Sequence, residues 1–314
     1  MKLFTLIHIN KKEQSLHNNA FFIRNIEEQI NLYFACAKQL LHYTLKSAGI
    51  ELIIITNEKA FLEKLNKDHY EIGITQIDFS LNVPSGLNFY SAHFKLEVYA
   101  YLAALQDDYV GLIDNDIICV NKMPECFKNI ISCKIPLYYD ITEQVTPAFG
   151  EKRIISDKEK VSKAKSVGLW VGGEFLCGPP DFFKKLCAEI TKAESEYFKV
   201  ADSLHHQSDE VLTSVAIESM KVNDGLKIFD AGSLSIIIRY WSPKPLHVQK
   251  PLNAYFNHFL LHLPSDKNFI TKLKQNELKG NTFFAKYRRH VIISRMLQKT
   301  FKSIKPYIKK AMKR

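Results

Sequence analysis

The first 120 residues alternate between short apolar runs and longer segments with helical periodicity, and this alternation constrains the fold most strongly. The runs LFTLIHI, ELIIITN, IGITQIDF and YVGLIDNDIICV have the length and apolar character of buried strands. Residues 27–48, FLEKLNKDH and residues 91–106 carry helical patterns, and Gly49 follows the first as a stop signal. Apolar strands joined by helices form a mainly parallel sheet with helices on both faces. The sequence therefore predicts an α/β fold whose ligands bind beyond the carboxyl ends of the strands.

The second half of the chain is more mixed. LWVGGEFLCGPPDFFKKLCAEI predicts a strand, a glycine-rich break and a helix that opens near Pro179 and Pro180. SDEVLTSVAIESM predicts a helix with Ser208 as its N-terminal cap, and LSIIIRYW and HFLLHL predict strands. A short helix from Lys267 to Leu278, capped by Ser265, is expected to follow.

Length and composition exclude several classes of protein. A chain of 314 residues with 46% hydrophobic residues can form one large domain with an appendage, or two modest domains. It has no apolar run long enough to span a bilayer, and MKLFTLIHINKKEQ predicts a first strand in place of a signal peptide. The six cysteines form no CxxC pair and indicate structural thiols in a reducing compartment, so we expect a cytoplasmic protein.

The positive charge is concentrated at the C-terminus. Residues 279–314 contain twelve Lys or Arg and no Asp or Glu; removing 12 from the net charge of +10 leaves −2 for residues 1–278. The basicity therefore belongs to a tail and does not indicate a basic active site or a DNA-binding fold.

Two carboxylates, Asp114 and Asp116, directly follow buried apolar residues in GLIDND. Positions i and i+2 of a continuing strand face the same side, so both side chains can meet one hard cation, and Mg²⁺ or Mn²⁺ prefers such oxygen ligands. The alternative is a polar turn in which Asp or Asn hydrogen-bonds its own backbone. The spacing alone leaves both readings open.

The stretch FKLEVYAYLAALQDDYVGLIDNDIICV resembles the metal-site region of GT-A glycosyltransferases, especially those of family eight. In these families a helix with a basic residue precedes a strand that ends in a DxD motif; the matching positions are Lys95 and Asp114, Asn115 and Asp116. The resemblance implies a nucleotide-sugar donor, with UDP as the nucleotide, whose diphosphate is held through Mn²⁺ or Mg²⁺. A solvated helix lysine is the alternative reading of Lys95.

Two further segments resemble family six and family eight enzymes. Gly172 and Gly173 match the glycine-rich strand that lines the sugar site, although a strand bulge also explains them. Asp209 and Glu210 match an acidic helix start near the anomeric carbon, where ordinary helix N-terminal chemistry is an equally good explanation. The resemblance implies catalytic carboxylates and a retaining reaction.

The segment FLLHLPSDKNF resembles the late strand of family eight, which ends in a metal-binding histidine followed by a phosphate-contacting lysine. His262 and Lys267 match in order and character, but the family's glycine and Lys-Pro-Trp ending are absent. His247 is a rival for the third metal ligand. The resemblance covers about residues 1–268 in the order of elements.

We therefore expect a GT-A catalytic domain at 1–268 and a basic amphipathic helical tail at 269–314, interrupted at Pro306. The tail suits an anionic membrane surface, its cations would also suit nucleic acid, and a disordered arm that binds a partner protein is a third reading. Beside a transferase body we expect the membrane and not nucleic acid, with a glycan or glycolipid acceptor such as lipopolysaccharide or capsule and a peripheral place on the inner membrane face. A nucleotidyltransferase would need a glycine-rich basic loop, which HINKKEQ lacks, and a haloacid-dehalogenase-type phosphatase would need a Thr shortly after the motif. A basic membrane- or nucleic-acid-binding protein without catalysis remains the other alternative.

Overall fold

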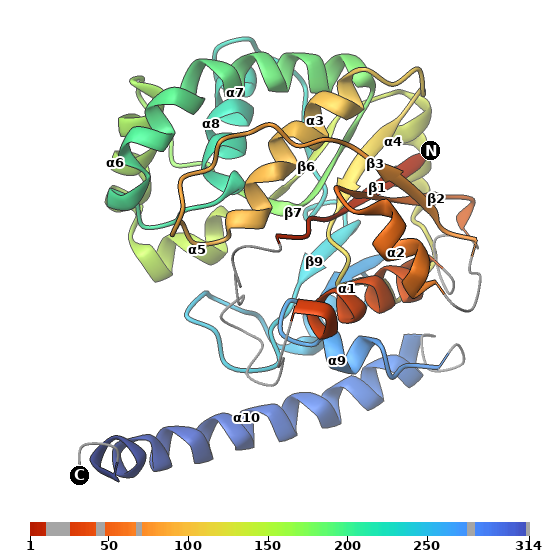
Figure 1. Ribbon diagram of the computed structural model, residues 1–314, viewed down its shortest axis with the longest axis vertical. Coiled ribbons are helices and arrows are strands. Elements are labelled where there is room, and N and C mark those ends of the chain that lie inside the picture. The colour runs from red at the N-terminus through yellow and green to blue at the C-terminus, as the bar shows by residue number, and fades with distance from the viewer. Residues whose placement is uncertain (11–25, 42–47, 67–70, 275–279, 312–314) are drawn as a thin grey trace.

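The computed structural model describes the chain except for residues 11–25, 42–47, 67–70, 275–279 and 312–314, and it describes no side chain beyond residue 300 (Figure 1). The strands are β1 (Lys2–Ile7), β2 (Glu51–Thr56), β3 (Gly73–Gln76), β4 (Val110–Ile113), β5 (Ile117–Cys119), β6 (Leu137–Asp140), β7 (Val171–Gly178), β8 (Phe229–Asp230), β9 (Ile237–Arg239) and β10 (Leu260–His262). The α-helices are α1 (Ile26–Leu40), α2 (Lys59–Leu65), α3 (Lys95–Ala103), α4 (Glu125–Ser132), α5 (Thr142–Phe149), α6 (Glu151–Ser162), α7 (Pro180–Val200), α8 (Asp209–Val222), α9 (Lys267–Ile270) and α10 (Gly280–Ala311).

The larger sheet confirms the predicted α/β architecture. Its strand order is β3-β2-β1-β4-β7-β6-β8, and β1, β2, β3 and β4 run parallel to one another. Strand β7 runs antiparallel to both of its neighbours, β4 and β6. Every residue of β4 and β7 is buried, as expected for strands covered on both faces.

Helices lie on both sides of this sheet. Helices α3, α7 and α8 pack against one another and against β4 and β7, whereas α1 packs against β1 on the other side (Figure 1). One continuous hydrophobic core extends through these layers from Leu3 to Leu260. The sheet and its helices thus form a rigid support for the carboxyl ends of β1 and β4.

A second, three-stranded sheet has the order β5-β10-β9. Strand β10 is antiparallel to β5 and parallel to β9, and its register sets His262 opposite Ile117 and Arg239. The chain passes from the larger sheet to the smaller one through residues 114–116, which connect β4 to β5. The aspartates of the DND segment therefore stand where the two sheets meet.

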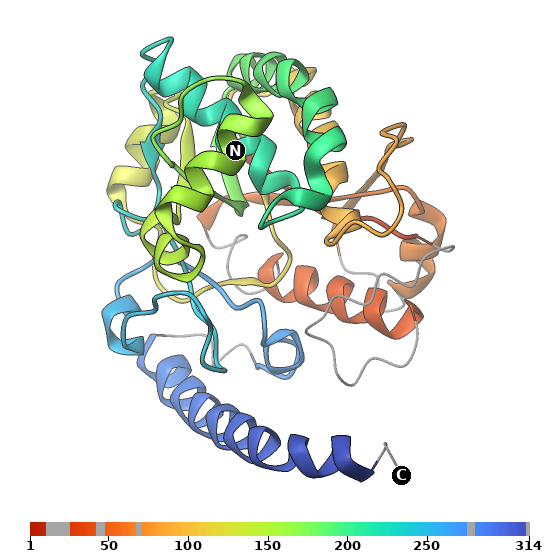
Figure 2. The ribbon, with the colours of Figure 1, turned by 90° about the vertical axis from the view of Figure 1, so that its left-hand side faces the viewer.

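Helix α10 lies along one end of the molecule, beneath α1 and α9 (Figures 1 and 2). Its first turns bury Phe283, Phe284 and Tyr287 in a second hydrophobic cluster that also contains Ile118 and Leu261 of the small sheet. The buried carboxylate of Asp266 accepts hydrogen bonds from Tyr287 Oη (2.6 Å) and His290 Nε2 (2.7 Å). The start of α10 is thereby fixed to the residue that precedes Lys267. The division into a catalytic domain at 1–268 and a helical tail at 269–314 stays a prediction.

Several local expectations can be compared with the structure. Ser208 caps α8 as predicted and accepts from the Glu210 backbone N–H at 3.2 Å. The cap position of α9 is Asp266 and not Ser265, since Asp266 O accepts from the amide of Ile270 (2.9 Å). The expected interruption at Pro306 was also wrong, because the helical backbone continues to Ala311; a proline can bend a helix without ending it.

Parts of two predicted helices, at residues 42–47 and 275–278, lie outside the described residues. Among the helices that the structure describes, none is both long enough and apolar enough to cross a bilayer.

Candidate active site

A cavity of 380 Å³ opens at the carboxyl ends of β1 and β4, where the α/β pattern places ligand sites. Its wall combines residues from the end of β1, helix α1, the β4–β5 connection, β7, the start of α8, and the two later strands β9 and β10. Nearly all of the residues proposed from the sequence line this one cavity: Lys95, Asp114, Asn115, Asp116, Gly173, Asp209, Glu210, His247, His262 and Lys267.

The backbone positions the DND segment from both sheets. The amide of Asp114 donates to the Glu174 carbonyl of β7 (3.0 Å), which extends the larger sheet by one residue. The carbonyl of Asp116 accepts from the amide of Leu263 (3.0 Å), just after β10. Each aspartate is therefore held by a different sheet, and both face the cavity at their junction.

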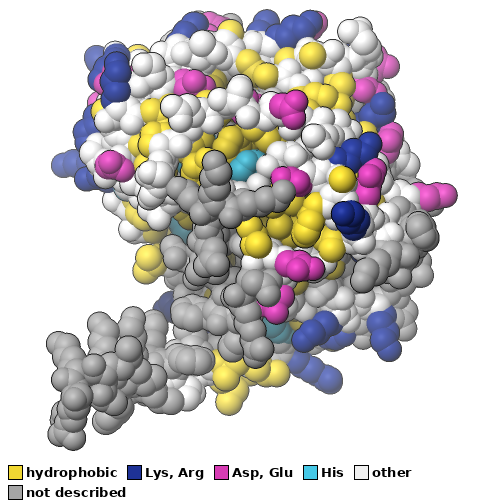
Figure 3. Space-filling model, viewed as in Figure 1, with side chains coloured by type: hydrophobic (Ala, Val, Ile, Leu, Met, Phe, Trp, Pro, Cys, Tyr) yellow, Lys and Arg dark blue, Asp and Glu magenta, His cyan; other side chains and the backbone are white. Residues whose placement is uncertain are grey.

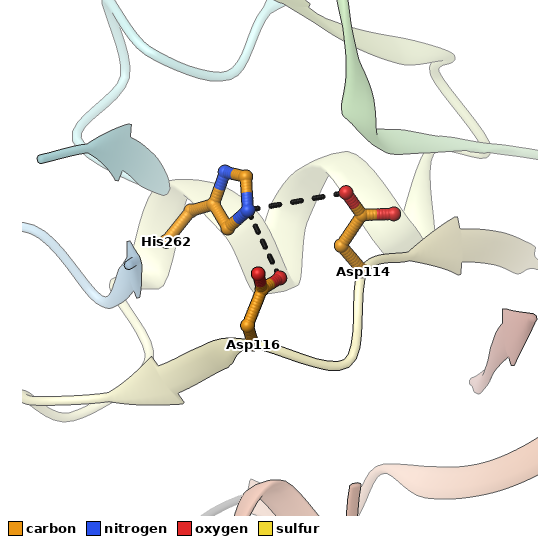
Figure 4. Close-up of side chains that lie close together, drawn as sticks. All are labelled: Asp114, Asp116 and His262. Atoms are coloured by element: carbon orange, nitrogen blue, oxygen red, sulfur yellow. Dashed lines mark ion pairs between the residues drawn. The ribbon is translucent and has the colours of Figure 1, made fainter. Parts of the chain in front are cut away.

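Asp114, Asp116 and His262 form the one group of possible metal ligands in the described part of the chain (Figure 4). One ligand atom from each lies within 4.8 Å of the others; His262 Nε2 is 3.0 Å from Asp116 Oδ1 and 3.9 Å from Asp114 Oδ2. Two ligands of one Mg²⁺ ion lie no more than about 4.2 Å apart, given metal–oxygen distances of about 2.1 Å. The spacing around His262 fits such an ion.

The second nitrogen of His262 also meets a carboxylate, because Nδ1 lies 3.1 Å from Glu174 Oε1. Burial opposes a charged ring, but Asp116 and Glu174 outweigh it and raise the pKa of His262 to about 9. Without a metal ion the imidazolium satisfies both carboxylates. A histidine that keeps Nδ1–H on a carboxylate while Nε2 binds a cation is a common arrangement in metal sites, so these residues fit the implied divalent ion.

Two lysines flank the aspartates. Lys95, at the start of α3, is buried; its Nζ lies 2.7 Å from Asp114 Oδ1 and donates to the Gly173 carbonyl at 2.8 Å. Lys267 pairs with the other aspartate, Asp116. Burial opposes both charges, yet the neighbouring carboxylates raise the pKa of each lysine. Both lysines are therefore fixed cations at the cavity wall, and a freely solvated Lys95 is excluded.

Glu174 and Arg239 form a buried ion pair that the sequence analysis did not assign. Arg239 Nε lies 3.6 Å from Glu174 Oε1, and one terminal nitrogen lies 4.0 Å from Glu210 Oε1. Burial alone would raise the pKa of Glu174, but Arg239 and His262 lower it to about 2. The sequence feature that could have pointed to Arg239 as a site residue is its charge inside the apolar run LSIIIRYW.

The two acids at the start of α8 have different surroundings. Glu210 accepts from Trp170 Nε1 (2.9 Å) and the Gly173 amide (3.3 Å), and its side chain is 16% exposed. Asp209 is 3% exposed, and its Oδ2 has no hydrogen-bond partner among the described residues. Lys95 Nζ is 3.9 Å away, so burial dominates and raises the pKa of Asp209 to about 7.

The two glycines of β7 leave room for the neighbouring carboxylates of Asp209 and Glu174. A Cβ on Gly173 would lie 2.7 Å from Asp209 Oδ2, and a Cβ on Gly172 would lie 2.3 Å from Glu174 Oε2. Gly173 lines the cavity, whereas Gly172 is not among the lining residues. Both glycines lie inside a continuous strand, so no break occurs at this point.

His247 lies on a different wall from the metal group. It stacks on Trp241 with ring centroids 6.2 Å apart and meets Phe149 edge-on at 5.8 Å. Of the two rival histidines, His262 is the one grouped with both aspartates. Histidine and hydrophobic side chains are visible together on the face shown in Figure 3.

An α/β fold with two aspartates and a histidine at the junction of two sheets defines a candidate metal-assisted enzyme site. No family model and no curated protein sequence matches the chain. The solved structures that resemble it include, at 11% sequence identity each, the bifunctional glycosyltransferase WbbM in its apo form (TM-score 0.49) and an active-site mutant of LgtC (TM-score 0.47). The matches cover 83% and 84% of this chain, and 45% and 87% of those chains, so this chain spans less than half of WbbM.

Proposed function

We propose that the chain is a metal-dependent glycosyltransferase that moves a sugar from a nucleotide-sugar donor, with UDP as the nucleotide, to a glycan or glycolipid acceptor. The observation that carries the proposal is the convergence of Asp114, Asp116 and His262 in the wall of one large cavity. Lysines 95 and 267 flank that group. This combination suits a ligand that carries a diphosphate and is held partly through a divalent cation.

In this proposal Asp114, Asp116 and His262 would hold Mn²⁺ or Mg²⁺, and the ion would supply positive charge for the departing nucleoside diphosphate. Lys267, which pairs with Asp116, would contribute a second positive charge toward a phosphate oxygen. Lys95 stays between Asp114 and the Gly173 carbonyl, where it fixes the aspartate and adds a positive charge beside the donor. Asn115, which also lines the cavity, would contact the donor.

Glu210 is the carboxylate better suited to face the transferred sugar. Its side chain is held by Trp170 and the Gly173 amide and still reaches the cavity, whereas Asp209 is enclosed between Lys95 and Gly173. A fixed carboxylate at this place would stabilise an oxocarbenium-like state in a retaining reaction. Asp209 would be a second carboxylate behind it, with Oδ2 3.9 Å from Lys95 Nζ.

The proposal is tested by thermal unfolding with a panel of nucleotide sugars, with and without Mn²⁺. A ligand at a hundredfold excess over its dissociation constant stabilises the native state by about 2.7 kcal/mol. We expect one donor to raise the unfolding midpoint only when Mn²⁺ is present. Asp114→Asn and Asp116→Asn should each abolish this shift, because an amide is a weaker ligand for a hard cation.

The matched control is Asp108→Asn, an exposed acid that pairs with Lys134 and is not among the residues that line the cavity. It should leave the donor-dependent shift unchanged. A shift with free UDP that persists in both metal-site variants would refute the metal role. Transfer of a nucleotidyl group in place of a sugar, detected by mass spectrometry of the products, would establish the nucleotidyltransferase alternative.

We also propose that α10 rests on an anionic membrane surface near a lipid-linked acceptor. Ile292, Ile293, Met296 and Leu297 are exposed on one side of this helix, and a group of hydrophobic side chains stands at the lower edge of Figure 3, beside the residues drawn in grey. The same segment contains no acidic residue after position 279. An exposed apolar face bordered by cations is typical of helices that lie in the plane of a membrane.

Sedimentation with anionic and with neutral vesicles tests this surface. The wild-type chain should sediment with the anionic vesicles, and Ile293→Glu with Met296→Glu should remain in the supernatant. Val167→Glu, an exposed apolar residue elsewhere, serves as the control and should sediment like the wild type. Equal sedimentation of the tail variant and the wild type would contradict the membrane surface.

A further inference from the structure

The wall of the cavity that carries His247 is built from aromatic rings. Its members are Trp241, His247, Phe149, His205 and Trp170, with successive ring centroids at 6.2, 5.8, 4.9 and 4.9 Å. All five line the cavity, and they come from α5, the start of β7, the segment before α8 and the loop after β9. We call this row the aromatic wall. The metal group and Lys267 do not belong to it.

Within the aromatic wall, His205 is anchored from behind by a buried carboxylate. Asp157 of α6 accepts from the His205 backbone amide and lies against the ring nitrogen Nδ1, both at 2.8 Å. Arg153 and Lys160 complete the surroundings of this carboxylate at 2.9 and 3.3 Å. Burial opposes its ionisation, but the hydrogen bonds from His205 and Arg153 outweigh it and lower the pKa of Asp157. An ionised carboxylate accepts only, so it fixes the proton of His205 on Nδ1.

In the neutral ring with its proton on Nδ1, the other nitrogen of His205, Nε2, is a hydrogen-bond acceptor. The side chain is 7% exposed, and Nε2 has no hydrogen-bond partner among the described residues. Trp241 Nε1, at the other end of the aromatic wall, is likewise buried and has no such partner in the described chain. Buried polar atoms without partners are costly, so this pair indicates a ligand that supplies one donor and one acceptor.

The charges around the wall disfavour an anionic ligand there. Burial lowers the pKa of His247 to about 4 and also lowers the pKa of His206, so both rings are neutral at pH 7. Two carboxylates face the cation of Arg239, Glu174 Oε1 at 3.6 Å and Glu210 Oε1 at 4.0 Å, although its Nε and one terminal nitrogen have no hydrogen-bond partner among the described residues. Aromatic faces with isolated hydrogen-bonding atoms instead suit a neutral ring that carries hydroxyl groups.

We infer that the aromatic wall is a subsite for a neutral pyranose of the acceptor, in which His205 Nε2 accepts from a sugar hydroxyl and Asp157 acts as the positioning residue for His205. This inference depends on the proposed glycosyl transfer only in that it identifies the bound pyranose as part of the acceptor. The binding of a pyranose to this wall is independent of the metal group. A ligand on the wall lies beside Glu210, because Trp170 belongs to the wall and donates to that carboxylate.

The test uses intrinsic fluorescence, since the two tryptophans of the chain, Trp170 and Trp241, both belong to the aromatic wall. The probes are methyl glycosides of glucose, galactose, mannose and N-acetylglucosamine. We expect at least one to change the emission saturably in the wild-type chain. His205→Ala should weaken this binding about five- to tenfold, as expected for the loss of one hydrogen bond, and His205→Gln should restore part of it.

Asp157→Asn tests the positioning role. Its amide can donate to Nδ1 and so transfer the ring proton to Nε2; we expect binding as weak as in His205→Ala, with a lowered unfolding midpoint because Arg153 and Lys160 lose their carboxylate, and with a transition that stays cooperative. His258→Ala, which alters a half-buried histidine outside the cavity wall, is the matched control and should bind like the wild type. Equal binding by the wild type, His205→Ala and Asp157→Asn would overturn the inference, and so would the absence of any saturable change.

The failure of this inference can be told apart from the failure of the proposed function. Mn²⁺-dependent binding of a nucleotide sugar together with unchanged glycoside binding in His205→Ala would overturn the aromatic-wall subsite alone. Glycoside binding that requires His205, with no nucleotide sugar bound under any condition, would support the subsite and overturn the transferase.

Discussion

Asp209 offers a quantitative test of the electrostatics of the site. Its carboxyl is buried at the start of α8, Oδ2 has no hydrogen-bond partner in the described chain, and the nearest cation, Lys95 Nζ, is 3.9 Å away. Lys95 is instead engaged by Asp114 and the Gly173 carbonyl. Burial therefore raises the pKa of Asp209 from 3.8 to about 7 in the folded chain.

The sign of the effect follows from proton binding. Between pH 3.8 and pH 7 the folded state holds a proton on Asp209 and the unfolded state does not, so folding is favoured at the acidic end of this window. Each pH unit inside the window changes the free energy of unfolding by about 1.36 kcal/mol. The wild-type chain should lose about 2.3 kcal/mol of stability between pH 5 and pH 7 through this one group, because the carboxyl is already half ionised at pH 7.

Asp209→Asn removes the titration while keeping a similar shape. We expect the difference in the free energy of unfolding between wild type and variant to fall by about 2.3 kcal/mol from pH 5 to pH 7, measured by urea denaturation. Asp181→Asn is the control: Lys184 lowers the pKa of this exposed acid, so its difference should be flat over the same range. A flat difference for Asp209→Asn, or one that grows with pH, would show that the pairing with Lys95 governs Asp209.

Substitutions at three further positions test a buried ion pair, the packing of two strands and a helix cap. Lys158→Met leaves the partly buried Glu218 carboxylate without its cation at 2.7 Å and should cost about 3–5 kcal/mol in denaturation; a loss below about 1 kcal/mol would refute the pairing. Gly111→Ala places a Cβ 2.8 Å from the Leu176 carbonyl oxygen, so it should separate β4 from β7, lower the midpoint and weaken donor binding; an unchanged midpoint would contradict this. Ser208→Ala removes the cap of α8 and should cost about 1 kcal/mol, whereas Ser208→Asp should retain the wild-type stability.

The fold was predictable where patterns are local. Buried apolar runs predicted β1, β2, β4 and β7, because a strand covered on both faces leaves no room for polar side chains. The antiparallel direction of β7 was not predictable from its own residues, since direction depends on how α4 to α6 carry the chain back. The separation of β5 into a second sheet likewise depends on pairing with β10, more than 140 residues later.

The candidate site was likewise predictable from local patterns and not from contacts between distant segments. The spacing of Asp114 and Asp116 predicted a shared direction, and the structure brings His262 to them through the β5–β10 pairing. The roles of Glu174, Arg239 and Asp157 could not be read from the sequence. Each depends on contacts between distant segments, such as Asp157 with His205, and a lone charge in a helix or strand carries no record of its partner.

The position of the aspartates at the junction of two sheets has a consequence for cooperativity. Asp114 is fastened to the larger sheet, whereas Asp116 and His262 belong to the smaller one, which supports α10 through the second hydrophobic cluster. An ion bound by all three side chains would act as a crosslink between two units that could otherwise open separately. Amide hydrogen exchange should then show Mn²⁺ slowing exchange in β10 and also in the first turns of α10, which carry no metal ligand, while β2 and β3 exchange as before.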